Sequence, residues 1–204
     1  MKFKKVIFSV IFAALFLTAF IAGSFMVKDF QSTSAAEDAK IELAVSYIYR
    51  DASYVVTAFP YTTINLTQTA LMKVFSGEKS EALSYLNTRV DRSLQASYSL
   101  MDEICENFKN LLTAHSVSET SMYYTKYNEL CDMFTALKTS STELIKRTRA
   151  FINGSTSTKD SYYTSYAEQL SDLSDKIEAY GTQLDNEYNA LMKPLLGDDY
   201  DIVA

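Results

Sequence analysis

Apolar residues recur along most of this chain at alternating steps of three and four positions, beginning near Ser34. This spacing places them along one side of an α-helix and is typical of helices packed in a bundle. The strict apolar-polar alternation that marks a half-buried strand is absent from the sequence. Four such stripes follow one another, with turn signals between them. The pattern therefore predicts an all-α fold with four helical arms.

The first arm is predicted to run from about Ala35 to Phe75. Pro60 falls in its middle, and a proline there kinks or splits a helix because it lacks the backbone N–H that the helix interior needs. We expect one arm, kinked at Pro60. Its stripe consists of Ile41, Val45, Ile48, Ala52, Val55, Phe59, Ile64, Leu71 and Val74.

Turn signals delimit the other three arms. Ser76-Gly77 precedes a second arm that should end near His115. Ser116 followed by Glu119 fits a capping box, in which side chains occupy the free backbone amides at a helix start, and predicts that the third arm begins there. Asn153-Gly154 supplies a left-handed stop, and a Ser/Thr-rich turn then leads into the fourth arm. The fourth stripe is Tyr163, Tyr166, Leu170, Leu173, Ile177, Tyr180, Leu184, Tyr188 and Leu191.

The four arms have similar lengths of about 37 to 40 residues, or roughly 55 to 60 Å each at the helical rise of 1.5 Å per residue. Short turns force neighbouring arms to run antiparallel, so we expect residues 35–196 to form an up-down-up-down four-helix bundle. In that topology the Ser76-Gly77 and Gly154 turns lie at one end. Ser116 and an acidic tail, residues 197–204, lie at the other end.

The N-terminal segment has a different character. Residues 1–5 include three lysines, and residues 6–27 are almost wholly apolar, which is long enough for a helix to span ~30 Å of hydrocarbon. Because basic flanks favour the cytoplasmic side, we expect residues 1–5 in the cytoplasm and residues 6–27 as a single-pass transmembrane anchor. A neck at residues 28–34 then leads to an extracytoplasmic bundle, and the protein is predicted to reside at the cell membrane.

A cleaved signal peptide is the alternative interpretation of this segment. Ala22-Gly23-Ser24 and Ser34-Ala35-Ala36 each resemble a small-residue cleavage site, and cleavage would release a secreted bundle. The apolar run exceeds the ~7 to 15 residues of a usual signal core, so the anchor is the favoured interpretation.

Composition narrows the class of partner. The 204 residues carry a net charge of −6 and a sequence pI near 4.9, whereas nucleic-acid-binding domains usually present a net basic face. We therefore expect no nucleic-acid partner. The chain contains only five glycines and two prolines, which suits long helices better than a many-stranded sheet.

The single histidine, His115, limits the available chemistry. It excludes His-rich zinc sites and the paired Glu-x-x-His ligands of di-iron bundles, and we also expect no Ser-His-Asp triad. The sequence also lacks a Gly-rich phosphate loop and a Cys-x-x-Cys motif, and no Asp or Glu interrupts the apolar stripes. We therefore expect no enzyme, no catalytic residue, no metal site and no cofactor. We expect His115 to cap the carbonyls at the end of the second arm.

The two cysteines, Cys105 and Cys131, fall on consecutive antiparallel arms, about 11 residues before and 15 after Ser116. This places them within about one helical turn of facing each other. A disulfide is possible outside the cell. Two separate buried thiols that fill core space are the alternative.

A group of arginines toward the end of the bundle far from the membrane forms a candidate anion site. Guanidinium groups bind carboxylates well, so a carboxylate ligand or an anionic envelope polymer would fit. The alternative is a solvated charged face that nearby carboxylates neutralise. The arginines are Arg89, Arg92, Arg147 and Arg149, and the carboxylates are Glu81, Asp91 and Glu143.

Two stretches carry a family-like pattern. Residues 90–109 contain Val90-Asp91, Leu94-Gln95, Tyr98, Leu100, Glu106 and Lys109, and residues 187–197 contain Glu187-Tyr188-Asn189-Ala190-Leu191 and Gly197. They resemble the first long helix and the C-terminal Tyr-Asn segment of the LemA family. Asp102-Glu103 stand where that family has Pro-Asn, and an extra arm separates Val90 from the apolar span. The resemblance implies a membrane-tethered helical bundle without an assigned enzymatic activity.

The N-terminal span, the arm lengths and the up-down order are also similar to the periplasmic four-helix sensor domains of chemoreceptors. The sequence ends at Ala204 without a second span or signalling module, so we do not expect a complete receptor. We expect a non-enzymatic envelope scaffold or protein-interaction module, with exposed faces of the second and third arms contacting a protein partner. The alternative is a solute-binding or sensory bundle with an interhelical Tyr/Arg site.

Overall fold

The computed structural model describes residues 34–154 and 159–196. The basic segment (residues 1–5), the expected anchor (residues 6–27), most of the neck and the acidic tail (residues 197–204) lie outside the described residues. Within the described part, none of the helices combines the length and the apolar character that a membrane crossing requires.

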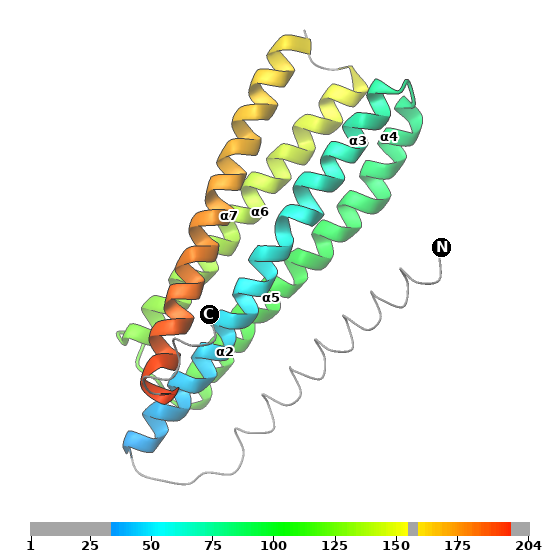
Figure 1. Ribbon diagram of the computed structural model, residues 1–204. Coiled ribbons are helices and arrows are strands. Elements are labelled where there is room, and N and C mark those ends of the chain that lie inside the picture. Colours follow the sequence, from blue (N-terminus) through cyan, green and yellow to red (C-terminus); the bar gives the residue numbers. More distant parts are fainter. Residues whose placement is uncertain (1–33, 155–158, 197–204) are drawn as a thin grey trace.

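Every regular element of the described residues is helical, and the elements form four arms (Figure 1). The prediction of an all-α fold with four arms is confirmed. Two arms contain a short π-helix, labelled η. The first arm consists of α2 (Ser34–Pro60), η2 (Tyr61–Asn65) and α3 (Leu66–Phe75); the second of α4 (Lys79–Tyr85), η3 (Leu86–Val90) and α5 (Asp91–Ala114); the third of α6 (Met122–Asn153); the fourth of α7 (Lys159–Leu196).

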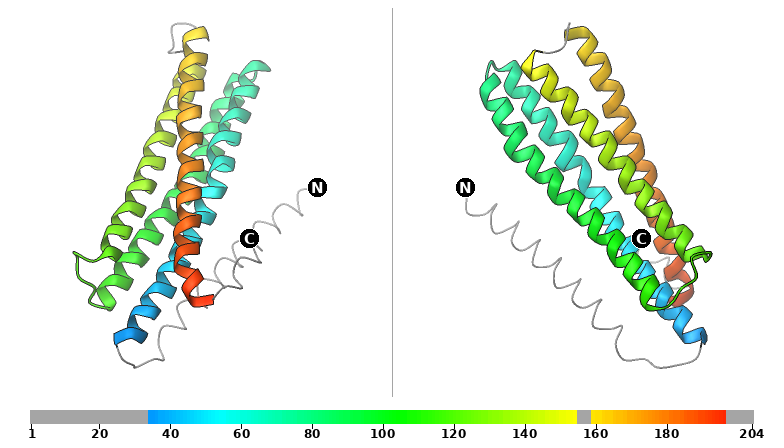
Figure 2. Two further views of the ribbon diagram at one scale, coloured as in Figure 1. Left: turned by 60° about the vertical axis from the view of Figure 1, so that its left-hand side comes forward. Right: turned by 180° about the vertical axis from the view of Figure 1, so that it is seen from behind.

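The chain reverses direction at each turn, so consecutive arms lie antiparallel (Figures 1 and 2). We call the end where α2 begins and α7 ends the base, and the end that carries the Ser76-Gly77 turn the tip. Toward the base, α2 packs against α5 and α7, and α6 packs against the same two helices. Toward the tip, α3 packs on α4 and reaches α6, while α7 continues along α6. The two halves of the bundle are therefore packed differently.

Pro60 is accommodated within a continuous arm. A proline cannot donate a backbone hydrogen bond, and the chain widens into the π-helix η2 directly after it. The hydroxyls of Thr62 and Thr63 both donate to the carbonyl of Phe59, and the hydroxyl of Thr67 donates to the carbonyl of Thr63. The expected irregularity at Pro60 thus takes the form of a wider helical turn. The second π-helix, η3, follows no proline and was not predicted.

The turns at the tip and at the base end their helices in the same way. Gly77, at φ 82°, donates to the carbonyl of Val74, and the next amide returns to Lys73. At the base, Ser116 has φ 50° and donates to Thr113, and the next amide returns to the carbonyl of Leu112. Both pairs of bonds satisfy carbonyls that the last helical turn leaves free.

The predicted capping box at Ser116 and Glu119 is wrong. Ser116 is in the left-handed conformation that ends α5, so it does not begin the next helix. The third arm begins at Met122, and the side chain of Ser121 accepts the amide of Tyr124 at 3.3 Å. The stop at the end of this arm is confirmed, since Gly154 has φ 77°.

The core follows the predicted stripes and runs the length of the bundle. The buried hydroxyl groups of the core form hydrogen bonds within their own arms. Each donates to a backbone carbonyl three or four residues earlier, and the residues are Ser46, Thr63, Thr67, Ser141 and Thr148. The largest fully buried side chains are Tyr49, Phe59, Phe108, Phe134, Leu86, Met101, Leu112, Leu130, Leu137, Leu144, Ile152 and Leu173.

Candidate interaction surface

The two cysteines are joined. Cys105 of α5 and Cys131 of α6 form a disulfide, with their Cα atoms 5.9 Å apart. One turn along α5, the ring of Phe108 meets those of Tyr49 and Tyr127 edge to face, at centroid distances of 6.3 and 5.8 Å. The disulfide therefore closes α5 onto α6 next to an aromatic layer near the base.

Polar contacts tie the other helices of the base together. The ammonium of Lys126 on α6 pairs with the carboxylate of Glu187 on α7, and both side chains are largely covered. The hydroxyl of Tyr49 on α2 donates to the backbone carbonyl of Lys126 at 3.4 Å. Burial, followed by the charges of Glu187 and Glu129, holds the pKa of Tyr49 well above its usual value. Tyr49 therefore stays neutral and can keep donating.

The candidate arginines are held by different neighbours. Arg149 reaches the second arm, where it bonds Asp91 of α5 at 2.8 Å and Asn87 of η3 at 3.2 Å. Arg147 lies beside Glu143 of its own helix at 3.2 Å and bonds Ser165 of α7. Asp91 and Glu143 thus do neutralise two of the four arginines.

The other two predicted anion-site residues, Arg89 and Arg92, are exposed. Glu81, the third carboxylate of the predicted neutral face, bonds Lys73 at 3.0 Å in the tip turn instead. The structure therefore distributes these charges over several helix faces, and Arg147 and Arg149 do not share an acceptor.

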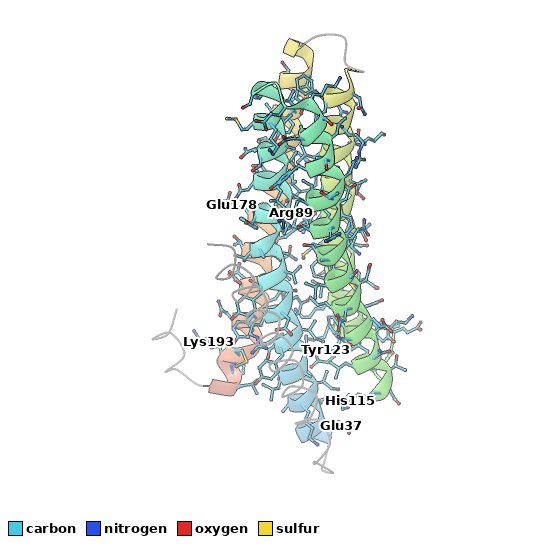
Figure 3. The ribbon with its side chains drawn as sticks, turned by 90° about the vertical axis from the view of Figure 1, so that its right-hand side faces the viewer. Glu37, Arg89, His115, Tyr123, Glu178 and Lys193 are labelled. Atoms are coloured by element: carbon cyan, nitrogen blue, oxygen red, sulfur yellow. A yellow bond between two sulfur atoms is a disulfide. The ribbon has the colours of Figure 1, made fainter. Side chains whose placement is uncertain are left out.

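A hollow of about 360 Å³ lies at the base, between the start of α2 and the α5–α6 turn. His115, Glu37 and Tyr123 come together there (Figure 3). The imidazole Nδ1 of His115 is 3.6 Å from Oε1 of Glu37. Burial first, and then the carboxylates of Glu42 and Asp38, raise the pKa of Tyr123.

His115 occupies the end of α5 as predicted, but its side chain serves another purpose. Among the described residues, its imidazole faces the Glu37 carboxylate of α2 rather than the carbonyls of its own helix. The left-handed turn at Ser116 already satisfies those carbonyls, so no side-chain cap is needed. Across residues 34–154 and 159–196, no three His, Cys, Asp or Glu side chains are grouped so that they could hold a metal ion.

The outer side of the first arm is uncharged and aromatic. From Ala52 to Met72 the sequence contains no Asp, Glu, Lys, Arg or His, whereas charged residues interrupt any stretch of comparable length in the other arms. Tyr54, Tyr61 and Met72 are 57, 65 and 64% exposed. Large apolar side chains are thus concentrated on a surface where charged residues would normally provide solubility.

These residues belong to a second stripe, which we call the uncharged stripe. Its members recur in steps of four and three, like the inner stripe of the arm, but every one of them is exposed. A 4-3 repeat of this kind is the pattern by which one helix packs against another. The uncharged stripe consists of Tyr54, Ala58, Tyr61, Asn65, Gln68, Met72 and Phe75.

Sequence reasoning missed this surface. It placed the contact faces on the second and third arms, where exposed charges are frequent. The signal that could have revealed it was the missing charge between Asp51 and Lys73. A helix of a solvated bundle normally carries charged residues on its outer face, so an uncharged outer face needs another explanation.

Comparison with known proteins gives no relative for this arrangement: the chain matches no family model, no curated protein and no solved structure.

Proposed function

We propose that this protein is a non-enzymatic interaction module. Residues 6–27 hold a helical bundle at the outer face of a cell membrane, and the bundle binds a protein through the uncharged stripe of its first arm. The exposed stripe is the observation that carries the proposal. Protein interfaces are enriched in Tyr, Phe and Met and depleted of Lys, Glu and Asp at their centre, which is the composition of this surface.

The disulfide supports the extracytoplasmic location. Disulfides persist in oxidising compartments, and thiol buffers keep most cytosolic cysteines reduced. The Cys105–Cys131 bond therefore suits a bundle that lies outside the cytoplasm. The basic residues 1–5 and the apolar residues 6–27 support the same orientation. The local resemblance to the LemA family agrees with a tethered bundle, and membership in that family stays a prediction.

Photo-crosslinking in living cells tests this proposal. A photoreactive amino acid replaces Tyr61 in the full chain, and the matched control carries it at Glu103, an exposed position of α5. We expect covalent protein adducts at position 61 in the membrane fraction, and at least tenfold fewer at position 103. Equal labelling at the two positions, or recovery of the chain only in the soluble fraction, would contradict the proposal.

A solute-binding or sensory function is the second candidate, and the basal hollow favours it. Its walls include Glu37 and Asp38 and it lies where the chain enters α2, so a small organic cation is the chemistry that fits. A thermal-shift screen of the full chain in detergent against polyamines and basic amino acids tests this function. Stabilisation that Glu37→Gln abolishes and Glu103→Gln leaves unchanged would support it, and a flat screen would exclude cations of this class.

A further inference from the structure

We propose that the partner of the uncharged stripe is the same stripe of a second copy of this chain, with the two bundles side by side and their bases pointing the same way. This inference rests on the proposed function, because tethering both copies in one membrane is what makes them parallel. In that arrangement a twofold axis runs along the length of the bundles.

The charges of the chain favour self-pairing through this face. A parallel twofold contact places each residue opposite or close to its own counterpart, so any charged face would meet its own charge. The outer side of α7 illustrates the difficulty, since Asp172, Asp175, Glu178 and Asp185 are all exposed along it. With a net charge of −6, two copies repel each other on most faces. Between Ala52 and Met72 the stripe has no charge to repel its copy.

The spacing of the stripe suits helix pairing. Tyr54, Tyr61, Gln68 and Phe75 recur every seven residues, and Ala58, Asn65 and Met72 recur every seven residues between them. This is the arrangement of the two contact positions in a paired helix. Each series includes one amide side chain, Gln68 in the first and Asn65 at the centre of the second. In parallel helix pairs a central Asn bonds its counterpart and fixes the register, so Asn65 gives the pair one alignment.

The size of the contact is adequate for tethered copies. From Ala52 to Met72 the arm extends for roughly 30 Å at 1.5 Å per residue. The surface area buried by a contact along one helix is near or below the lower limit for a stable complex of untethered partners, which bury ~1,200 to 2,000 Å². Two chains in one membrane meet at a high effective concentration, so a small interface suffices.

Single cysteines introduced along the stripe test the pairing in the full chain in its native membrane. The variants are Tyr54→Cys, Tyr61→Cys and Met72→Cys, and the control is Glu103→Cys on α5. Under mild oxidation we expect each stripe variant to form a disulfide-linked dimer with its own copy, at least tenfold faster than the control. Links at all three positions require a parallel alignment, because an antiparallel pair would bring position 54 close to position 72.

The other outcomes overturn the inference in distinguishable ways. Dimers that form only when Tyr54→Cys and Met72→Cys are mixed would show antiparallel pairing. Linkage of Tyr61→Cys to a different protein would leave the proposed function intact and refute the second copy as partner. A chain that stays membrane-bound without forming links above the control would refute the pairing alone. Extraction of the chain by carbonate would refute the tether.

A charge placed in the stripe provides an independent test. Tyr61→Glu puts like charges opposite each other in the pair, and Tyr61→Phe keeps the contact surface. Because Tyr61 is exposed, neither change should disturb the bundle, which circular dichroism verifies. Measured as the rate of linkage through Met72→Cys, dimerisation should fall at least tenfold with Glu and less than twofold with Phe. Equal rates for the two variants would overturn the proposal.

Discussion

The base and the tip of this bundle are held together by different interactions. At the base, directional contacts join three pairs of helices: the disulfide joins α5 to α6, Lys126 and Glu187 join α6 to α7, and Ser53 of α2 donates to Asp185 of α7 at 2.6 Å. Toward the tip, Arg149 and Asp91 join α6 to α5, and Phe151 stacks on Tyr162 with centroids 3.8 Å apart. In the tip half, α3 packs on α4 and α6. Both π-helices also lie in this half, η2 in the first arm and η3 in the second.

This difference indicates which half opens first. Ion pairs occur in both halves, but only the base has a covalent bond between two helices, and a disulfide keeps the helices that it joins close together. We therefore expect exchange of backbone amides to be fastest in α3 and α4 and slowest where α5 and α6 meet near the disulfide. Five predictions test or refine this comparison.

The largest effect is expected from the aromatic layer of the base. Phe108→Ala removes a fully buried ring that contacts Tyr49 and Tyr127, and should lower the free energy of unfolding by about 3 to 5 kcal/mol. Phe75→Ala is the matched control at the tip, where the ring is 49% exposed, and should cost less than about 1 kcal/mol. Chemical denaturation measures both, and equal costs would remove the distinction between base and tip.

Loss of the disulfide comes next. Replacing Cys105 and Cys131 with Ala opens a loop of 26 residues in sequence separation and should cost about 3 kcal/mol of stability. Hydrogen exchange should accelerate in the basal parts of α5 and α6 before it does so in α3 and α4. Reductant should destabilise the parent protein and leave the variant unaffected. A uniform acceleration along all four arms would mean that the base is not a separately stabilised unit.

Two tyrosines, of which Tyr98 is half-buried and Tyr166 is buried, allow a comparison of hydroxyls with and without a hydrogen-bond partner. The hydroxyl of Tyr98 lies 2.6 Å from Ser141 Oγ and 3.0 Å from Thr142 Oγ1, while that of Tyr166 has no hydrogen-bond partner among the described residues. Tyr98→Phe should therefore cost about 1 kcal/mol, whereas Tyr166→Phe should stabilise the protein by up to about 1 kcal/mol. Denaturation at neutral pH measures both changes, and a loss in both variants would contradict the assignment of Tyr166 as unsatisfied.

Tyr166 also predicts that the stability of the protein falls at alkaline pH. Burial raises the pKa of Tyr166 to about 12 from a usual value of 10. The folded state therefore holds this proton more tightly than the unfolded state does. The resulting stability is present below pH 10 and is lost as the pH rises toward 12. Thermal melts of Tyr166→Phe between pH 9 and 12 should show a shallower decline than those of the parent.

The smallest effects are expected in the two turns. Gly77 at the tip and Ser116 at the base both have positive φ, but only glycine adopts that conformation without a steric cost. Ser116→Gly should stabilise the protein by up to about 1 kcal/mol, and Gly77→Ser should destabilise it by a similar amount. Melting temperatures of the two variants measure the changes, and shifts of the same sign would contradict this account.

The four arms could be predicted because burial on one side leaves a 3-4 pattern, seen in residues such as Leu173, Ile177 and Leu184. The turns at Gly77 and Gly154 could be predicted because glycine signals positive φ. The turn at Ser116 could not, since a serine in the left-handed region has no sequence signature and Glu119 falsely suggested a cap. The π-helix η3 leaves the spacing of Leu86 and Val90 unchanged, so the sequence pattern does not reveal it.

The candidate surfaces were less predictable for a related reason. The basal hollow exists because the start of α2 meets the α5–α6 turn, which brings Glu37 and His115 together from positions far apart in the chain. The spacing of residues within one helix does not predict such a contact between two helix ends. The proximity of Cys105 and Cys131 followed from the topology, but the sequence left open whether they are bonded. The pattern of charges suggested an anion site at the arginines. The informative feature was instead the stretch from Ala52 to Met72, which has no charged residue.

The position of the disulfide also determines how the bundle would respond to mechanical force. Because α2 begins and α7 ends at the base, tension applied between these two ends would peel the outer arms away in sequence rather than shear all four at once (Figure 1). The loop between Cys105 and Cys131 would then remain closed. At roughly 3.5 Å per extended residue, its 26-residue separation withholds about 90 Å of contour length from the stretched chain. Under tension the protein would therefore extend as two segments, one before Cys105 and one after Cys131, which the disulfide joins at the α5–α6 corner.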